Sequence, residues 1–229
     1  MISVTQLNNL KLSKRLQAIY DLVPQSNVLA DIGSDHAFLP IALVLNGKVT
    51  RAYASEVNEG PYEATVKNIE KHGVSNYVIP VLSDGISELE KDVNTISICG
   101  MGGSLIVDIL DKDKEKLEHV TTLVLEPNNN EESVRIWLMN NGFEIAFEKL
   151  IEEDGRYYEI IKSVKGNANY IKEELFFGPV LLKEKGESFV KKWSNHRTYL
   201  LRIMANINDK ECFNYKLLED IVSLINNII

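Results

Sequence analysis

Short apolar runs alternate with segments of helical periodicity over residues 1–165. The apolar runs predict five strands, at residues 28–31, 51–56, 78–82, 95–99 and 122–125, and each ends at or just before polar or glycine residues. The intervening segments predict helices at residues 7–23, 38–45, 61–73, 104–110 and 132–139, with a further short helix after Asp84-Gly85. Strands and helices that alternate in this way are typical of a parallel α/β sheet.

Two further apolar segments break this alternation. Asn141-Gly142 leads into an apolar segment over 143–150, and Asp154-Gly155 turns back into a second one over 156–165. Because Asn-Gly and Asp-Gly pairs are strong turn signals, we expect these two strands to form an antiparallel hairpin. Seven strands with a final antiparallel pair depart from a plain dinucleotide-binding fold and match the Rossmann-like sheet of class I methyltransferases.

The C-terminal residues have a helical pattern throughout. Apolar and aromatic positions recur in steps of four and three along two seams, namely Phe189, Trp193, His196, Leu200, Ile203 and Ile207, then Leu217, Ile221, Leu224 and Ile228. Residues 206–214 form a short polar connection, so we predict an antiparallel, coiled-coil-like helical hairpin. The chain then divides into a sheet domain over residues 1–167 and a helical arm over residues 168–229. A solvated coiled coil or a dimer contact is the alternative role for the arm.

The segment that follows the first predicted strand has the pattern of a cofactor site. Asp31 and Gly33 stand where the strand passes into a helix, a favoured ligand position in doubly wound sheets. Glu56 ends the second strand 23 residues after Gly33, close to the spacing of about 20 expected for an acid that binds ribose hydroxyls.

The same segment disfavours a dinucleotide. Residues 33–38 read Gly-Ser-Asp-His-Ala-Phe, which lacks the second glycine of the pyrophosphate motif. Asp31 and Asp35 would repel a diphosphate but attract a cationic sulfonium and an amino-acid ammonium group, and S-adenosylmethionine carries both. An ordinary strand, turn and helix with solvated acids is the alternative interpretation.

Composition narrows the class of protein. With 229 residues and 45% hydrophobic residues, the chain has ample material for one α/β domain and a smaller appendage. It has neither a signal-like N-terminus nor an apolar run of about 20 residues, so we expect a cytoplasmic protein without a membrane contact. Cys99 and Cys212 lack the paired spacing of zinc ligands, and we therefore expect no metal.

The net charge of −8 disfavours a uniform nucleic-acid surface, but the charge is unevenly distributed. Residues 168–229 hold 9 Lys and Arg against 8 Asp and Glu, which leaves 16 against 25 for residues 1–167. Within residues 183–202, six basic side chains face only Glu184 and Glu187. The arm therefore carries a local basic surface on an acidic protein.

Four motifs in a fixed order give the chain a specific resemblance. They are Asp-Ile-Gly-Ser-Asp-His at 31–36, Ile-Cys-Gly-Met-Gly-Gly at 98–103, Glu-Pro-Asn at 126–128 and Glu-Asp-Gly-Arg-Tyr-Tyr-Glu-Ile at 153–160. In this combination the chain resembles the bacterial tRNA adenine-22 N1-methyltransferases over nearly its whole length. The resemblance implies a Rossmann-like catalytic domain, S-adenosylmethionine as the cofactor, and methylation of adenosine 22 of tRNA at ring nitrogen N1.

The resemblance also implies roles for individual residues. Asp31, Gly33, Ser34, Asp35 and His36 would surround the methionine part of the cofactor. Glu56 would bind the ribose, and Asp84-Gly85 would face the adenine. The place where cofactor and target base meet would be lined by Gly100, Met101, Gly102, Glu126, Pro127 and Asn128, of which Glu126 and Asn128 join Asp31 and His36 as the residues nearest the chemistry. The general Gly-x-Gly-x-Gly pattern of methyltransferases is interrupted at Asp35 and Ala37.

Contacts to the RNA are expected outside this turn. Asn129, Arg156 and Tyr157 would lie near the displaced base, although core roles are an equal alternative for the two strand residues. Lys191, Lys192 and Arg197 would bind tRNA from the arm. We expect a monomer, with a dimer as the alternative.

The reaction itself requires no nucleophilic side chain. N1 of adenine has an in-plane lone pair that can attack the methyl group directly, so positioning and electrostatics suffice. Enzymes that methylate the exocyclic amine usually carry Asn/Asp-Pro-Pro-aromatic after the fourth strand, where this chain has Gly-Met-Gly-Gly. Methylation of another RNA or of a small molecule, and a non-catalytic RNA- or protein-binding protein on the same fold, are the alternatives.

Overall fold

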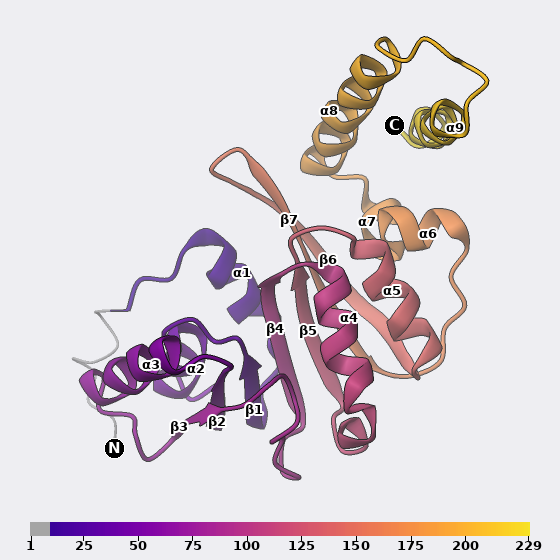
Figure 1. The fold of residues 1–229 in the computed structure, drawn as a ribbon. Helices are drawn as coiled ribbons and strands as arrows, with labels where there is room; N and C mark the ends of the chain where they lie inside the picture. The colour runs from indigo at the N-terminus through magenta and orange to yellow at the C-terminus, as the bar shows by residue number, and fades with distance from the viewer. Residues whose placement is uncertain (1–9) are drawn as a thin grey trace.

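A seven-stranded sheet runs through the centre of the structure, a computed structural model that describes residues 10–229 (Figure 1). The strands are β1 (Ser26–Ile32), β2 (Val49–Glu56), β3 (Val78–Leu82), β4 (Thr95–Met101), β5 (Thr122–Pro127), β6 (Phe143–Glu153) and β7 (Arg156–Lys165). Their order is β3-β2-β1-β4-β5-β7-β6. The first five strands pair in parallel, whereas β7 runs antiparallel to β5 and β6. The predicted sheet and its terminal hairpin are confirmed.

Helices cover both faces of this sheet. The helices α1 (Lys14–Leu22), α2 (Phe38–Leu45) and α3 (Glu59–Lys71) share one apolar core, while α4 (Gly103–Lys112) and α5 (Glu131–Asn140) share the other. A 3-10 turn, η2 (Lys114–Leu117), follows α4. Neighbouring strand residues alternate between the two cores, as Leu29 and Ala30 of β1 do, because side chains alternate across a strand. Among residues 10–229, no helix is long and apolar enough to span a membrane.

Two predicted elements differ in the structure. The leading helix starts at Lys14 rather than near residue 7, because the Ser13 hydroxyl accepts the Leu16 N–H at 3.1 Å and caps it. Residues 7–9 of that prediction lie outside the described residues. The short helix expected after Gly85 is absent, since residues 84–88 form a turn.

The arm consists of α6 (Lys172–Phe177), α7 (Pro179–Glu184), α8 (Glu187–Met204) and α9 (Phe213–Ile228). After the connecting loop, α9 returns toward the start of α8. Arg197 of α8 donates to Asn226 at 3.0 Å, and Lys185, just before α8, donates to the Ile228 carbonyl at the end of α9 at 2.8 Å. These contacts agree with the predicted antiparallel helical hairpin.

The apolar seam of α8 contacts two elements. Phe189 and Trp193 pack with Phe177 of α6, and Leu200 and Met204 belong to the same apolar cluster as Val222 and Ile225 of α9. Helix α8 ends before Ile207, which the heptad pattern had included.

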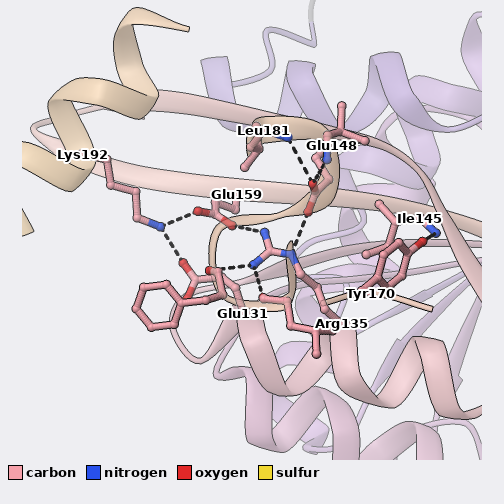
Figure 2. A network of polar contacts seen from close by, with 11 residues as sticks. Glu131, Arg135, Ile145, Glu148, Glu159, Tyr170, Leu181 and Lys192 are labelled. Atoms are coloured by element: carbon pink, nitrogen blue, oxygen red, sulfur yellow. Dashed lines mark hydrogen bonds and ion pairs between the residues drawn. The ribbon is translucent and has the colours of Figure 1, made fainter. Parts of the chain in front are cut away.

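A buried ion network joins the arm to the sheet (Figure 2). The fully buried Arg135 guanidinium donates to Glu148 at 2.8 Å and to Glu159 on the hairpin, and also to the carbonyl oxygen of Leu175 at 3.1 Å. On the other side of Glu159, Lys192 of α8 donates to it at 2.6 Å. Because these contacts connect α5, β6, β7, α6 and α8, the network fixes the base of the arm against the sheet.

Candidate active site

The turn between β1 and α2 has an unusual backbone. Gly33 has a φ of +68°, and the non-glycine residues Asp35, His36 and Ala37 follow with φ values of +43°, +66° and +55°. Such conformations are unfavourable for side chains other than glycine, and they concentrate at functional sites. The Gly33 and Ser34 N–H groups donate to the Ser55 carbonyl at 2.9 and 3.1 Å, which holds the turn against the end of β2.

Asp31 lies buried at the end of β1 and is held by two hydroxyl groups. Ser34 and Ser97 each donate to one of its carboxylate oxygens at 2.6 Å. Burial raises the pKa of Asp31 to about 6, against the opposing effect of these two hydrogen bonds. The carboxylate is therefore fixed in orientation beside the turn.

Glu56 ends β2 and faces the same turn. Its carboxylate accepts the Asp35 N–H at 2.7 Å, and burial raises the pKa of its carboxyl group. The Asp35 side chain itself is 91% exposed, with His36 Nε2 at 3.7 Å from its oxygen. Asp31 and Glu56, the two acids identified from the sequence, thus both accept hydrogen bonds from residues of the turn.

Glu126 is a second buried carboxylate, at the end of β5. It accepts the Gly100 N–H at 2.8 Å and Arg15 Nη1 at 3.1 Å, while its other oxygen has no hydrogen-bond partner among residues 10–229. Burial raises the pKa of Glu126 to about 7 despite the Arg15 guanidinium. The Asn128 side chain donates to the Gly100 carbonyl at 2.6 Å, so the ends of β4 and β5 are joined on both sides of this carboxylate.

A cleft of about 610 Å³ opens above these strand ends. It brings together eight residues predicted from the sequence, namely Asp31, Gly33, Ser34, Asp35, Gly100, Met101, Asn128 and Arg156. This volume is within the usual range for a small-molecule site. The cleft is lined by residues at the ends of β1, β4 and β5. Its position therefore matches the ligand-binding crevice expected in a doubly wound sheet.

Other predicted residues lie outside the lining of this cleft. His36, Glu56, Gly102, Glu126 and Pro127 belong to the same strand ends and turns but lie beside or behind it. Asp84 and Gly85 follow β3 at the neighbouring edge, where Asp84 forms an exposed ion pair with Lys112 at 2.7 Å.

Arg15, Phe38 and residues 11–13 also line the cleft, although no sequence pattern indicated them. Arg15 reaches Glu126 across 111 residues and stacks over the Tyr158 ring at 5.1 Å. No local motif marks it, because it is one of two adjacent basic residues at the start of an amphipathic helix. Only the folded chain reveals that Arg15 is the cation bound to Glu126.

A second pocket of about 740 Å³ adjoins the cleft at the base of the arm. The two cavities share Asn128, Arg156 and Tyr158. The second one also includes Asn129 and Tyr157, both predicted from the sequence, and it extends to α8. Arg156 and Tyr157 of the hairpin, predicted to face the RNA, therefore lie beside the first cleft.

One basic residue of α8, Lys192, does not face outward as predicted. Lys192 lies between Glu131 at 2.9 Å and Glu159 at 2.6 Å, and only 17% of its side chain is exposed. Its charge is neutralised within the protein, so the assignment of Lys192 to tRNA contact is corrected. Lys191 is exposed and paired with Glu152 at 2.8 Å, and Arg197 donates to Asn226 at 3.0 Å.

Comparison with known proteins agrees with this geometry. A family model described as tRNA (adenine(22)-N(1))-methyltransferase matches residues 29–227. The chain belongs to this family. Its resemblance to the bacterial adenine-22 methyltransferases, inferred from four sequence motifs, is thereby confirmed.

Individual family members are similar over nearly their whole length. The tRNA (adenine(22)-N(1))-methyltransferase of Bacillus subtilis (strain 168) is 37% identical over 209 residues, covering 88% of each chain. A Streptococcus agalactiae structure assigned to the NADB-Rossmann superfamily is 42% identical with a TM-score of 0.93, covering 96% of this chain and 98% of that one. A Streptococcus pneumoniae tRNA (m1A22) methyltransferase candidate, solved with S-adenosyl-L-methionine, is 39% identical with a TM-score of 0.89, covering 95% and 99%.

Proposed function

We propose that the strand ends of β1, β2, β4 and β5 carry out the reaction of this family, transfer of a methyl group from S-adenosylmethionine to N1 of adenosine 22 in tRNA. The observation that carries the proposal is the cleft itself, which is lined by the buried Asp31 of β1 and by aromatic and amide groups, with the buried Glu126 carboxylate of β5 beside it. The use of S-adenosylmethionine in this family agrees with the complex of the Streptococcus pneumoniae relative.

The residues present suit this cofactor. When bound, it supplies an electrophilic methyl group on a cationic sulfur. The acids of the turn, Asp31 and Asp35, favour its ammonium and sulfonium charges, and Glu56 at the end of β2 is placed for ribose hydroxyls. Gly33 and Ser34 let the backbone approach closely, His36 adds a polar contact, and Asp84-Gly85 faces the adenine from the next strand end.

The residues around Glu126 are assigned to the target base. Gly100, Met101, Gly102 and Pro127 shape the wall, and Asn128, whose amide nitrogen is engaged by Gly100, keeps its oxygen for the amino group of adenine. The product carries a positive charge on the adenine ring, which the adjacent Glu126 carboxylate stabilises. Arg15 holds that carboxylate in position at 3.1 Å.

The remaining residues are assigned to the tRNA. Asn129, Arg156 and Tyr157 contact the displaced nucleotide, and the exposed Lys191 and the nearby Arg197 contact the phosphate backbone from the arm of residues 168–229. We further propose a cytoplasmic monomer, in which residues 1–167 bind the cofactor.

Incorporation of labelled methyl into RNA tests this function. The protein is incubated with labelled S-adenosylmethionine and a tRNA transcript bearing adenosine 22, in parallel with a transcript carrying guanosine 22. We expect incorporation into the first transcript and none into the second. Equal incorporation into both would indicate another target nucleotide, and cofactor binding without transfer to any tRNA would indicate a binding protein.

A further inference from the structure

The second pocket, here named the arm-root pocket, lies between the loop after β5, the start of β7 and the helices α6 and α8. The residues that characterise it are Asn129, Tyr157, Phe176, Trp193, Asn195 and His196. Three of its rings form an aromatic wall. Phe176 and Trp193 lie 5.1 Å apart and tilted, and Trp193 and His196 lie 5.7 Å apart and edge-on. Trp193 is buried, so the half-buried rings of Phe176 and His196 offer apolar surfaces beside amide groups.

The charge of the pocket favours a neutral group over a phosphate. Glu131 and Glu132 contribute to its lining, and Lys192 is already paired with Glu131 and Glu159. Arg156 is then the lining cation outside this ion network. Proteins bind unstacked RNA bases by stacking them on aromatic rings and by hydrogen bonds to their edges, and this pocket combines both kinds of group.

The position of the pocket connects it with the reaction. It shares Asn128, Arg156 and Tyr158 with the cofactor cleft, so nucleotides next to a target base in the cleft are within reach of the pocket. Extrusion of one nucleotide also weakens the stacking of its neighbours. A neighbouring base is therefore available at the place where the aromatic wall begins.

The pocket is held in shape before any RNA binds. Lys192 joins α8 to Glu131 at 2.9 Å and to Glu159 at 2.6 Å, and Arg135 joins Glu159 to the carbonyl of Phe176 at 3.3 Å (Figure 2). Its walls are thus connected through one buried network. A preformed site binds with a smaller loss of conformational entropy.

We propose that the arm-root pocket binds the base of a nucleotide adjacent to the target adenosine and holds the substrate in its unstacked conformation. This proposal rests on the proposed function, because it assigns the pocket a second base of the same RNA. It makes the pocket a specificity determinant that acts on tRNA binding and not on cofactor binding.

Filling the pocket tests the proposal. Asn195 is exposed on α8 and lines the pocket, so Asn195→Trp should block it without disturbing the core. Leu201→Trp, at a position on the same helix that is 47% exposed and outside the pocket lining, is the matched control. Because stacking of one base contributes substantially to affinity, we expect Asn195→Trp to raise the KM for tRNA by about ten-fold, with unchanged cofactor affinity. The control should match the unsubstituted enzyme.

An abasic nucleotide identifies the occupant. Transcripts with an abasic site immediately before or after adenosine 22 are assayed with both enzymes. One of them should raise the KM of the unsubstituted enzyme about ten-fold and have little further effect on Asn195→Trp, since both changes remove one interaction. Independent, multiplying effects would overturn the proposal, as would a KM unchanged by Asn195→Trp. Absence of methyl transfer by the unsubstituted enzyme would instead refute the proposed function.

Discussion

Substitution of Arg135 by methionine should strongly destabilise the protein. The change retains much of the side-chain volume but leaves Glu148 and Glu159 buried without their main counterion. Removal of one partner from a buried ion pair costs about 3–5 kcal/mol. For a chain of this size, each kcal/mol lowers Tm by about 2–4 °C, so we expect a decrease of roughly 6–20 °C at pH 8.

The stability lost in the Arg135→Met variant should depend on pH, and the direction follows from the pKa values of the two carboxyl groups. In the unsubstituted protein, burial raises the pKa of Glu159, but Arg135 and Lys192 outweigh it and leave the pKa below its ordinary value. A carboxyl group with a lowered pKa stabilises the fold above its unfolded pKa, and this contribution is lost as the pH falls through the folded pKa. Burial already raises the pKa of Glu148 in the presence of Arg135. Without Arg135, the pKa of Glu148 should rise further and that of Glu159 should also rise, so the variant should gain stability as the pH falls. The difference in Tm should therefore narrow between pH 8 and pH 5.

Thermal unfolding followed by circular dichroism at both pH values measures this effect. Lys67→Met is the control, because Lys67 forms an exposed pair with Glu63 at 3.8 Å and its loss should leave Tm nearly unchanged. An Arg135→Met protein as stable as the control at pH 8, or a difference that widens toward pH 5, would refute the reasoning.

Four further substitutions test the cleft and the arm. Gly33→Ala should weaken cofactor binding in calorimetry, because its φ of +68° is unfavourable for alanine; equal affinity would contradict this. If the ionised form of Glu126 stabilises the product, kcat should rise as the pH passes about 7, and Glu126→Gln should abolish that rise. Arg15→Leu should shift the rise to higher pH, since it removes the cation that lowers the pKa of Glu126. Lys191→Glu should weaken tRNA binding and its salt dependence in filter binding, while unchanged binding would assign the arm another role.

The strand ends could be predicted from the sequence because their signals are local. Asp31, Gly33 and Glu56 lie in apolar runs that end abruptly, and their spacing reflects one strand-helix-strand unit. The contact between Arg15 and Glu126 could not be predicted, because it depends on the packing of α1 against β5, β6 and β7, which follow it much later in the chain. The neutralisation of Lys192 was missed for the same reason, since its partners come from α5 and β7.

The helical seams show a different limit of sequence reasoning. Heptad spacing establishes that α8 has an apolar face, but it does not identify what packs against that face. Phe177 of α6 packs against Trp193 on this face. His196 occupies a seam position but lines the arm-root pocket. The pattern therefore predicted the helical hairpin, but not the packing of α8 against α6 or the pocket beside it.

Identification of the methylated nucleoside tests the central claim most directly. After reaction with S-adenosylmethionine, a tRNA transcript bearing adenosine 22 is digested to nucleosides and separated by chromatography. The account predicts N1-methyladenosine, formed in proportion to the tRNA and absent when adenosine 22 is replaced. N6-methyladenosine, or N1-methyladenosine that persists without adenosine 22, would contradict it.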